Sequence, residues 1–94
     1  MTWSLVYATS AARAIRKLDP AARRRILAAL RTLREDPERG KPLQLTLKGL
    51  RSWRTGDYRI VYRLIDSRIE ILVVAVGHRR DVYDRLKKML DART

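Results

Sequence analysis

The first stretch of the chain alternates large apolar residues with smaller ones, and the spacing then becomes helical. Trp3, Leu5 and Tyr7 occupy every second position of residues 3–8, which predicts a first strand. Ser10 is expected to cap a helix, because apolar residues recur after it every three or four positions. These positions are Ala11, Ala14, Ile15 and Leu18.

A second helix is predicted directly after the first. Asp19 followed by Pro20 is typical of a helix start, and the segment 36–40 ends the helix at about Glu35. The residues expected to point inward are Ile26, Leu27, Leu30 and Leu33, and those expected to point outward are Arg23, Arg24, Arg31 and Arg34. Two helices joined by so short a turn form a helical hairpin.

The second half of the chain predicts strands and a last helix. Residues 41–49 allow either a strand or a loop framed by Pro42 and Gly49. Strands are predicted at 50–54, 58–65 and 68–76, with turns at 55–57 and 66–67. From Ile71 onward the strand at 68–76 is apolar on both faces, so we expect it in the middle of the sheet, ended by Gly77. An amphipathic helix is predicted from about Arg80 onward.

These elements predict an α+β fold in the order β-α-α-β-β-β-α. The N-terminal strand and helical hairpin would pack on a small twisted antiparallel sheet, followed by the C-terminal helix. We expect residues 1–94 to form a single domain, because so short a chain has no room for a second core.

The composition is strongly basic. The chain has 22 Lys and Arg against 10 Asp and Glu, a formal net charge of +12, and 17 of the 22 are arginine. Between Arg39 and Arg63 there are 7 basic residues and 1 acidic residue. A polyanion, either nucleic acid or an acidic protein, is the expected partner, although a generally solubilising surface would have the same composition.

The location expected from the sequence is the cytoplasm. There are no cysteines, so disulfides and thiolate metal sites are excluded. The N-terminus lacks the pattern of a signal peptide. The longest apolar run, residues 71–76, is far shorter than the ~20 residues of a membrane span.

Strand alternation at 58–65 divides this segment into two faces. The face with Tyr58 and Tyr62 is expected to pack on the helical hairpin, which leaves Arg59 and Arg63 on the other face. Arg54 and Arg79 are expected at the same sheet edge as Arg59, together with Tyr83. Several guanidinium groups beside a phenol suit a phosphodiester, so RNA cleavage is the favoured hypothesis.

Two motifs carry a resemblance to a known family. Residues 56–62, GDYRIVY, and residues 76–83, VGHRRDVY, resemble the RelE/ParE superfamily of bacterial toxins, and the RelE branch in particular. The resemblance extends over nearly the whole chain. It implies a ribosome-dependent mRNA endoribonuclease that enters the A site of the 70S ribosome, cleaves translated mRNA and inhibits translation. It also implies a cognate antitoxin that wraps around the toxin.

The resemblance implies catalytic roles for Arg59, which would contact the scissile phosphate, and for Arg79 and Tyr83. Some family members carry two lysines on the preceding strand, where this chain has Leu50 and Ser52. This departure affects how protons would be transferred.

The residues themselves suggest how the chemistry would be divided. RNA supplies its own nucleophile, so a ribonuclease must orient it, stabilise phosphoryl charge and move two protons. Arg59 and Arg79 suit the charge, and Tyr83 is assigned as base toward the 2′-OH, with Arg79 or His78 assisting the leaving oxygen. His78 after a strand is also typical of a structural histidine, and Tyr83 could instead pack in the core. No metal and no cofactor are expected.

Further side chains are expected to bind RNA without catalysing its cleavage. They are Arg51, Arg54, Arg63, Lys48, Trp53 and Arg80. Trp53 is the candidate for base stacking.

Two alternatives to the nuclease are a ParE-like inhibitor of DNA gyrase and a catalytically silent member of the same fold. An acidic, amphipathic antitoxin is expected to cover the basic face or a groove beside the last helix, where Leu86 and Met89 would be partly exposed. DNA binding is expected only through the antitoxin, and no membrane is expected as a partner.

Overall fold

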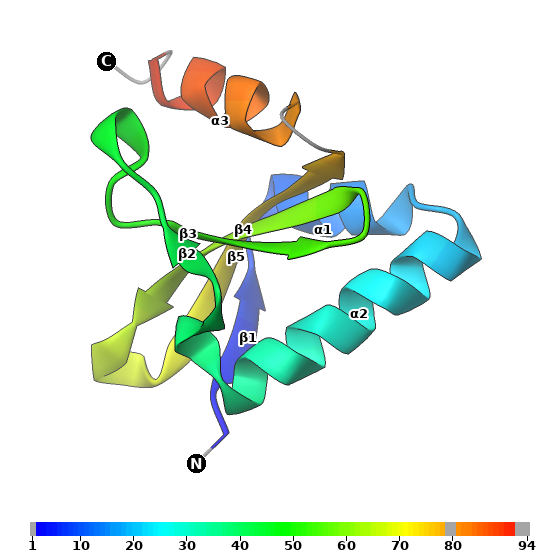
Figure 1. Cartoon of the computed structure of the whole chain (residues 1–94), viewed down its shortest axis with the longest axis horizontal. Coiled ribbons are helices and arrows are strands. Elements are labelled where there is room, and N and C mark those ends of the chain that lie inside the picture. Colours follow the sequence, from blue (N-terminus) through cyan, green and yellow to red (C-terminus); the bar gives the residue numbers. More distant parts are fainter. Residues whose placement is uncertain (1, 79–80, 92–94) are drawn as a thin grey trace.

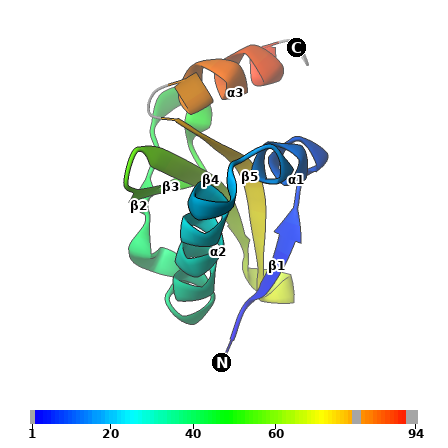
Figure 2. The same cartoon turned by 90° about the vertical axis from the view of Figure 1, so that its right-hand side faces the viewer.

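The computed structural model describes residues 2–78 and 81–91 and contains a five-stranded sheet with helices on both faces (Figures 1 and 2). The strands are β1 (Ser4–Tyr7), β2 (Lys41–Pro42), β3 (Arg51–Thr55), β4 (Tyr58–Ile65) and β5 (Glu70–His78). The helices are α1 (Thr9–Arg16), α2 (Pro20–Glu35) and α3 (Asp81–Asp91). The order β1-β5-β4-β3-β2 puts β5 inside the sheet, as its two apolar faces predict.

The sheet is mixed, although the α+β class and the order of the main elements are confirmed. Strands β2 to β5 pair antiparallel, whereas β1 runs parallel to β5. The expectation of an antiparallel sheet therefore fails at one edge. The helical hairpin separates β1 from the rest of the sheet in the chain, so no tight turn fixes the direction of β1.

The start of α2 follows its predicted capping, but the start of α1 does not. Asp19 Oδ1 accepts a hydrogen bond of 2.8 Å from the Ala22 amide, and Pro20 is the first helical residue. Helix α1 instead begins after Ala8, with no side-chain cap, so Ser10 lies inside the helix. The prediction that Ser10 caps α1 is wrong.

Arg23 closes the turn between the two helices instead of pointing into solvent. Its guanidinium donates to the carbonyl oxygens of Ile15, Arg16 and Leu18, at 3.3, 2.8 and 2.9 Å. Ile15 and Arg16 are the last two residues of α1 and Leu18 lies in the turn after it, so Arg23 adds donors where a helix end lacks them. The outward placement predicted for Arg23 is therefore wrong. Leu27, predicted to point inward, is 37% exposed.

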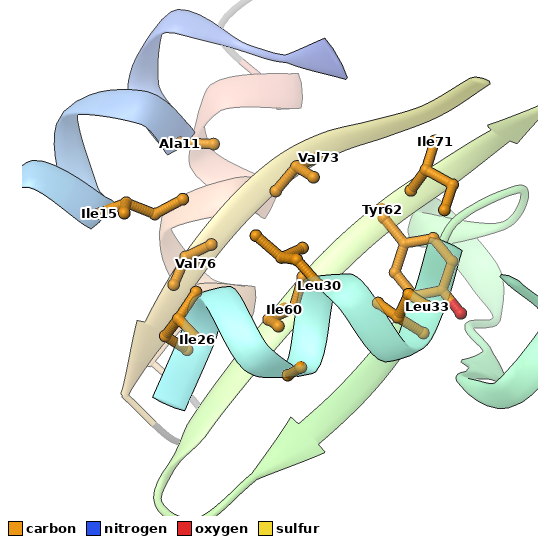
Figure 3. Close-up of a cluster of buried hydrophobic side chains, with 11 residues drawn as sticks. Ala11, Ile15, Ile26, Leu30, Leu33, Ile60, Tyr62, Ile71, Val73 and Val76 are labelled. Carbon is orange, nitrogen blue, oxygen red and sulfur yellow. The ribbon is translucent and has the colours of Figure 1, made fainter. Parts of the chain in front are cut away.

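The main core lies between the helical hairpin and the sheet (Figure 3). Ile26, Leu30 and Leu33 of α2 pack with Ile60 and Tyr62 of β4, and each of these side chains is at most 1% exposed. Burial of one such side chain stabilises the fold by roughly 1.5–3 kcal/mol. The predicted inward face of β4 is confirmed.

The hydroxyl of Tyr62 ties this core to the segment that follows α2. It donates to the Pro37 carbonyl at 2.7 Å and accepts from the Gly40 amide at 2.9 Å. Gly40 is required here, since a Cβ would lie 2.5 Å from the Tyr62 hydroxyl and 2.8 Å from the Ser52 carbonyl oxygen. Burial raises the pKa of Tyr62 above its ordinary value.

Two turns in the second half differ from the sequence prediction. Strands β4 and β5 are joined through a 3₁₀ turn, Asp66–Arg68, and Ile69 in the left-handed region with φ of 52°. The prediction of a two-residue hairpin turn at 66–67 is therefore wrong. Gly77 does not end β5 but pairs with Arg59 within the sheet.

Glycine at position 77 allows α3 to approach the sheet. A Cβ there would collide with the Arg85 guanidinium and lie 3.1 Å from Cβ of Val82. Val82 and Leu86 can therefore pack with Val61 and Leu47 in a second buried cluster on the other face of the sheet. Leu86 is only 2% exposed, so the predicted partial exposure of Leu86 is wrong. The side chain of Met89 lies outside the described residues.

The segment 43–50 completes this second cluster. Pro42 ends the short β2, and a 3₁₀ turn, Leu45–Leu47, follows, so both alternatives predicted for residues 41–49 are present in part. The Leu43 amide donates to the Leu50 carbonyl at 2.9 Å, which closes the loop. Leu45 has φ of 58°, a left-handed conformation that a leucine adopts at a cost of about 1–2 kcal/mol.

Replacing Tyr62 by phenylalanine should lower the free energy of unfolding by about 1–3 kcal/mol, because the Gly40 amide and Pro37 carbonyl lose their partner. The raised pKa of Tyr62 contributes stability that is present below pH ~10 and is lost as pH rises further. The Tyr62→Phe variant should therefore lose less stability than the wild type between neutral and strongly alkaline pH. Urea unfolding at several pH values measures both effects.

Tyr58→Phe is the matched control for the neutral-pH measurement. Within residues 2–78 and 81–91 the Tyr58 hydroxyl has no hydrogen-bond partner, so its removal should cost much less. Equal losses in the two variants would contradict a bridging role for the Tyr62 hydroxyl.

Candidate functional site

A groove of about 510 Å³ lies beside β3 and β4, where the first turn of α3 crosses the sheet. Its walls come from the segment after α2, from the two strands and from α3. The lining residues are Arg39, Lys41, Pro42, Leu43, Ser52, Trp53, Arg54, Arg59 and Tyr83. Four of these nine side chains are cationic and none is acidic, so the groove suits an anion.

Tyr83 and Arg59 meet at the centre of the groove wall. Arg59 Nη1 donates to the Tyr83 hydroxyl at 3.3 Å, and the guanidinium carbon lies 5.4 Å from the centre of the phenol ring. Val82 anchors α3 in the second core, so the next residue, Tyr83, emerges at the edge of that interface. Alternation along β4 directs Arg59 to the same face. The predicted convergence of Arg59 and Tyr83 is thus found in the structure.

Ser52 completes this arrangement from β3. Its Oγ lies 2.6 Å from the Tyr83 hydroxyl, a hydrogen bond in which either oxygen can donate. Ser52 is 8% exposed, so little water competes for this contact. The Tyr83 oxygen therefore has a cationic donor on one side and a neutral hydroxyl on the other.

Arg54 and Arg59 are direct register partners on neighbouring strands. Two like charges in this position repel each other and destabilise the sheet locally. Within the described residues the ion pairs are Arg39–Asp36 and Arg68–Glu70, both at 4.0 Å, so neither pair neutralises Arg54 or Arg59. A bound phosphate would relieve this repulsion.

Trp53 forms part of the groove wall but has little freedom to stack on a base. The side chain packs against the main core, and the Arg39 guanidinium lies 5.1 Å from its ring centre. One ring face is thus occupied by an arginine that the sequence did not single out. Arg39 and Lys41 could have been found from the surplus of basic residues that begins at Arg39.

His78 lies on the opposite face of the sheet from Arg59 and Tyr83. Its ring centre is 4.6 Å from that of Tyr58, its register partner, and Tyr58 packs against the helical-hairpin core. The structure does not bring His78 to the groove, because one residue along a strand reverses the face. This geometry favours the structural alternative for His78.

The other predicted RNA-binding side chains are dispersed. Arg51 donates to the carbonyls of Gly40 and Glu38 at 3.1 and 3.0 Å, so its guanidinium stabilises the segment after α2. Arg63 and Lys48 are exposed but do not line the groove. Arg79 and Arg80 lie outside the described residues.

Ser52 is the contact that sequence reasoning missed. The family resemblance marked this position only as one where some members carry lysine. Its separation from Tyr83 by 31 residues leaves no local pattern that would pair them.

Two further observations concern metal binding and membrane spanning. Residues 2–78 and 81–91 hold no group of three or more His, Cys, Asp or Glu side chains placed to bind a metal ion. In the same part of the chain, no helix has the length and apolar composition needed to cross a membrane.

Comparison with known families and sequences finds toxins. Residues 5–83 match the family described as the ParE toxin of type II toxin-antitoxin system, parDE. Toxin RelG of Mycobacterium tuberculosis is 38% identical over 91 residues, which cover 90% of this chain and all of the relative. Toxin RelE of the same organism is 40% identical over 52 residues, or 54% of each chain.

Solved structures show the same similarity. The toxin–antitoxin complex RelBE2 of M. tuberculosis contains a chain with a TM-score of 0.78 and 33% identity, and the match covers 84% of this chain and all of that chain. The intact RelBE toxin–antitoxin complex of E. coli gives a TM-score of 0.65 and 26% identity, covering 81% of this chain and 95% of that one.

We predict that inorganic pyrophosphate stabilises the protein through the groove, because an anion between Arg54 and Arg59 removes their repulsion. At about 100 times its Kd, such a ligand adds ~2.7 kcal/mol to the free energy of unfolding. Arg54→Gln should reduce this gain, while Arg63→Gln should retain it, since Arg63 is exposed on β4 but faces Leu72 across the strands. Thermal unfolding at constant ionic strength measures the effect, and equal losses in both variants would place the anion elsewhere.

Proposed function

Because the chain belongs to the RelE/ParE superfamily of toxins from type II toxin–antitoxin systems, we propose that it is a ribosome-dependent endoribonuclease. It cleaves translated mRNA in the ribosomal A site and so inhibits translation. The observation that carries this proposal is the contact of Arg59 and Ser52 with the Tyr83 hydroxyl inside a cationic groove.

The proposed reaction uses the 2′-OH of the RNA as nucleophile. The 2′ oxygen attacks the neighbouring phosphorus and the bond from phosphorus to the 5′ oxygen breaks, leaving a 2′,3′-cyclic phosphate and a 5′-hydroxyl end. Tyr83 in its phenolate form accepts the 2′-OH proton. Arg59 binds the phosphoryl oxygens, on which negative charge accumulates in the transition state.

Ser52 positions the Tyr83 oxygen in this scheme. A hydroxyl that donates to the phenolate stabilises its charge and fixes its direction, which a lysine would do with a full positive charge in other members. Since Arg59 also contacts this oxygen, a phenolate formed at Tyr83 would have two donors. In this chain the neutral hydroxyl of Ser52 thus does what the family resemblance assigns to a lysine in some members.

Arg79 is proposed to act on the leaving 5′ oxygen. In the sequence it stands two residues after Gly77, the register partner of Arg59, and four before Tyr83. Its guanidinium would stabilise charge on that oxygen, which takes its proton from water. His78 has no part in this step, since its ring packs with Tyr58.

Gyrase inhibition is the alternative, because the matching family is described by its ParE toxins. A protein that inhibits gyrase only by binding it carries out no proton transfer, so it does not need a phenol held between an arginine and a serine. The Arg59–Tyr83–Ser52 arrangement therefore favours the nuclease.

The proposed partner is a cognate acidic antitoxin that covers the groove. The structural relatives above are toxin–antitoxin complexes, and this chain carries a net charge of +12. An acidic segment in the groove would neutralise Arg54 and Arg59 and hide Tyr83 at once. The other partners are the ribosome and mRNA, and DNA is reached only through the antitoxin.

Arg59→Gln and Tyr83→Phe should each lower cleavage of a translated reporter mRNA by about 10²–10³, the range for loss of a transition-state donor or a general base. Primer extension on ribosomes programmed with the message measures the cuts. Arg63→Gln should cleave as the wild type does. Intact messages together with DNA damage after expression of the wild type would instead favour gyrase inhibition.

Ser52→Ala should lower cleavage less than Tyr83→Phe, because the phenol remains and keeps its Arg59 donor. Ser52→Thr retains the hydroxyl and should restore most of the rate. If Ser52→Ala cleaved at the wild-type rate across pH, the positioning role of Ser52 would be excluded.

Antitoxin affinity should fall as salt rises, since exposed charges are screened over ~8 Å at physiological ionic strength. Isothermal titration at several salt concentrations measures the dependence, and Arg54→Gln should make it shallower than Arg63→Gln does. An affinity that does not change with salt would show that apolar contacts dominate the complex.

A further inference from the structure

A second hollow adjoins the cationic groove and shares Tyr83 with it. It measures about 520 Å³, within the usual ~300–1,000 Å³ of small-ligand pockets. The loop 43–47 forms one wall, and Tyr83 and Lys87 of α3 form the other. Tyr83 and Leu43 line both hollows, so the two are neighbours. We call this second hollow the loop pocket; in Figure 1 its loop lies beside α3.

The lining of the loop pocket differs from that of the groove. Leucines at 43, 45 and 47 provide apolar surface, while Gln44 and Thr46 provide an amide and a hydroxyl. Such a combination suits a flat heterocycle whose faces are apolar and whose edge carries donors and acceptors. Among the described residues that line it, Lys87 is the one cation, so the pocket is less suited to phosphate than the groove is.

Leu45 has a conformation and an exposure that the isolated fold does not explain. Its φ of 58° favours glycine or asparagine, and its side chain is 89% exposed. The strain is thus not offset by burial of the leucine. Strained residues of this kind cluster at active sites and ligand sites. A group bound in the loop pocket would cover this side chain.

We propose that the loop pocket binds the base of the nucleotide on the 5′ side of the scissile phosphate, and that Leu45 and Gln44 determine which base is preferred. The inference rests on the proposed function, in which Tyr83 accepts the proton of that nucleotide's 2′-OH. The ribose is then at Tyr83 and its phosphate at Arg59, so the base extends to the other side of Tyr83. Trp53 is not available for this base, because Arg39 covers its ring.

The first test measures cleavage at messages that carry each of the four bases at this nucleotide. Gln44→Leu removes the hydrogen-bonding edge at similar size and should reduce discrimination between the best and worst base by roughly three- to tenfold. Leu45→Gly removes the apolar contact and should also reduce discrimination. Because glycine suits the backbone at position 45, this variant should fold at least as stably as the wild type.

Leu27→Ala is the matched control, since Leu27 is an exposed leucine of α2 that lines neither hollow. It should keep the wild-type order of bases. Cleavage by Gln44→Leu and Leu45→Gly with the wild-type order and ratio of bases would overturn the loop pocket while leaving the nuclease intact. Absence of cleavage by the wild type would contradict the proposed function itself.

A second test does not depend on cleavage. A 2′-O-methyl trinucleotide should shift the methyl NMR signals of Leu43 and Leu45, whereas the same trinucleotide with an abasic site at the 5′ nucleotide should shift neither. Shifts of equal size with both trinucleotides would show that the leucine methyls respond to phosphate and not to the base, which would overturn the proposal. The absence of a shift with either trinucleotide would overturn it too. If only an antitoxin peptide shifts these methyls, the occupant is a protein side chain and not a base.

Discussion

The packing of α3 against the sheet is the contact on which the candidate site depends. Val82 packs in the same buried cluster as Val61, and a Cβ at Gly77 would lie only 3.1 Å from Cβ of Val82. The next residue of the helix, Tyr83, is thereby held beside Arg59 and Ser52. A side chain at position 77 would displace the Arg85 guanidinium and press on Val82, the residue next to Tyr83. The close approach of α3 to β5 thus helps to hold a site that is built from three distant segments.

The groove concentrates positive charge, and within residues 2–78 and 81–91 Arg39 is the one groove cation that forms an ion pair. Arg54 opposes Arg59 across two strands, and Arg39 and Lys41 border the same space. The apolar core on the far face supplies the stability that this arrangement costs. A ligand with negative charge would relieve this repulsion as well as form new hydrogen bonds, so the proposed RNA substrate and the proposed acidic antitoxin would both fit the same surface.

Much of the fold could be predicted because it is encoded by local patterns. The period-two alternation of 58–65 correctly assigned Tyr62 inward and Arg59 outward, and Asp19–Pro20 correctly marked the start of α2. The parallel pairing of β1 could not be found this way, since it joins segments more than 60 residues apart. The prediction for Arg23 failed for a similar reason. Its partners are backbone carbonyls at the end of α1 and in the turn that follows, which no side-chain pattern reveals.

The candidate site was predictable only in part. Arg59 and Tyr83 were expected together and are in contact, whereas His78 lies on the other face. An irregularity between Val61 and Tyr62 shifts the register with β5 by one residue, so that Val74 and Ala75 both pack toward α3. A shift of this kind changes which residues share a face, and the sequence does not mark it. Ser52 was overlooked because a short hydroxyl acts only through a neighbour that the fold supplies.

The buried phenol of Tyr62 has a consequence for the outer wall of the groove. Its oxygen bonds Pro37 and Gly40, the residues on either side of the turn that carries Arg39. Interior packing and the position of a surface cation are thus mechanically linked. Selection for non-toxic variants of such a chain would therefore also recover substitutions in the core. Loss of the Tyr62 hydrogen bonds would displace the groove wall, although every charge on the surface remained.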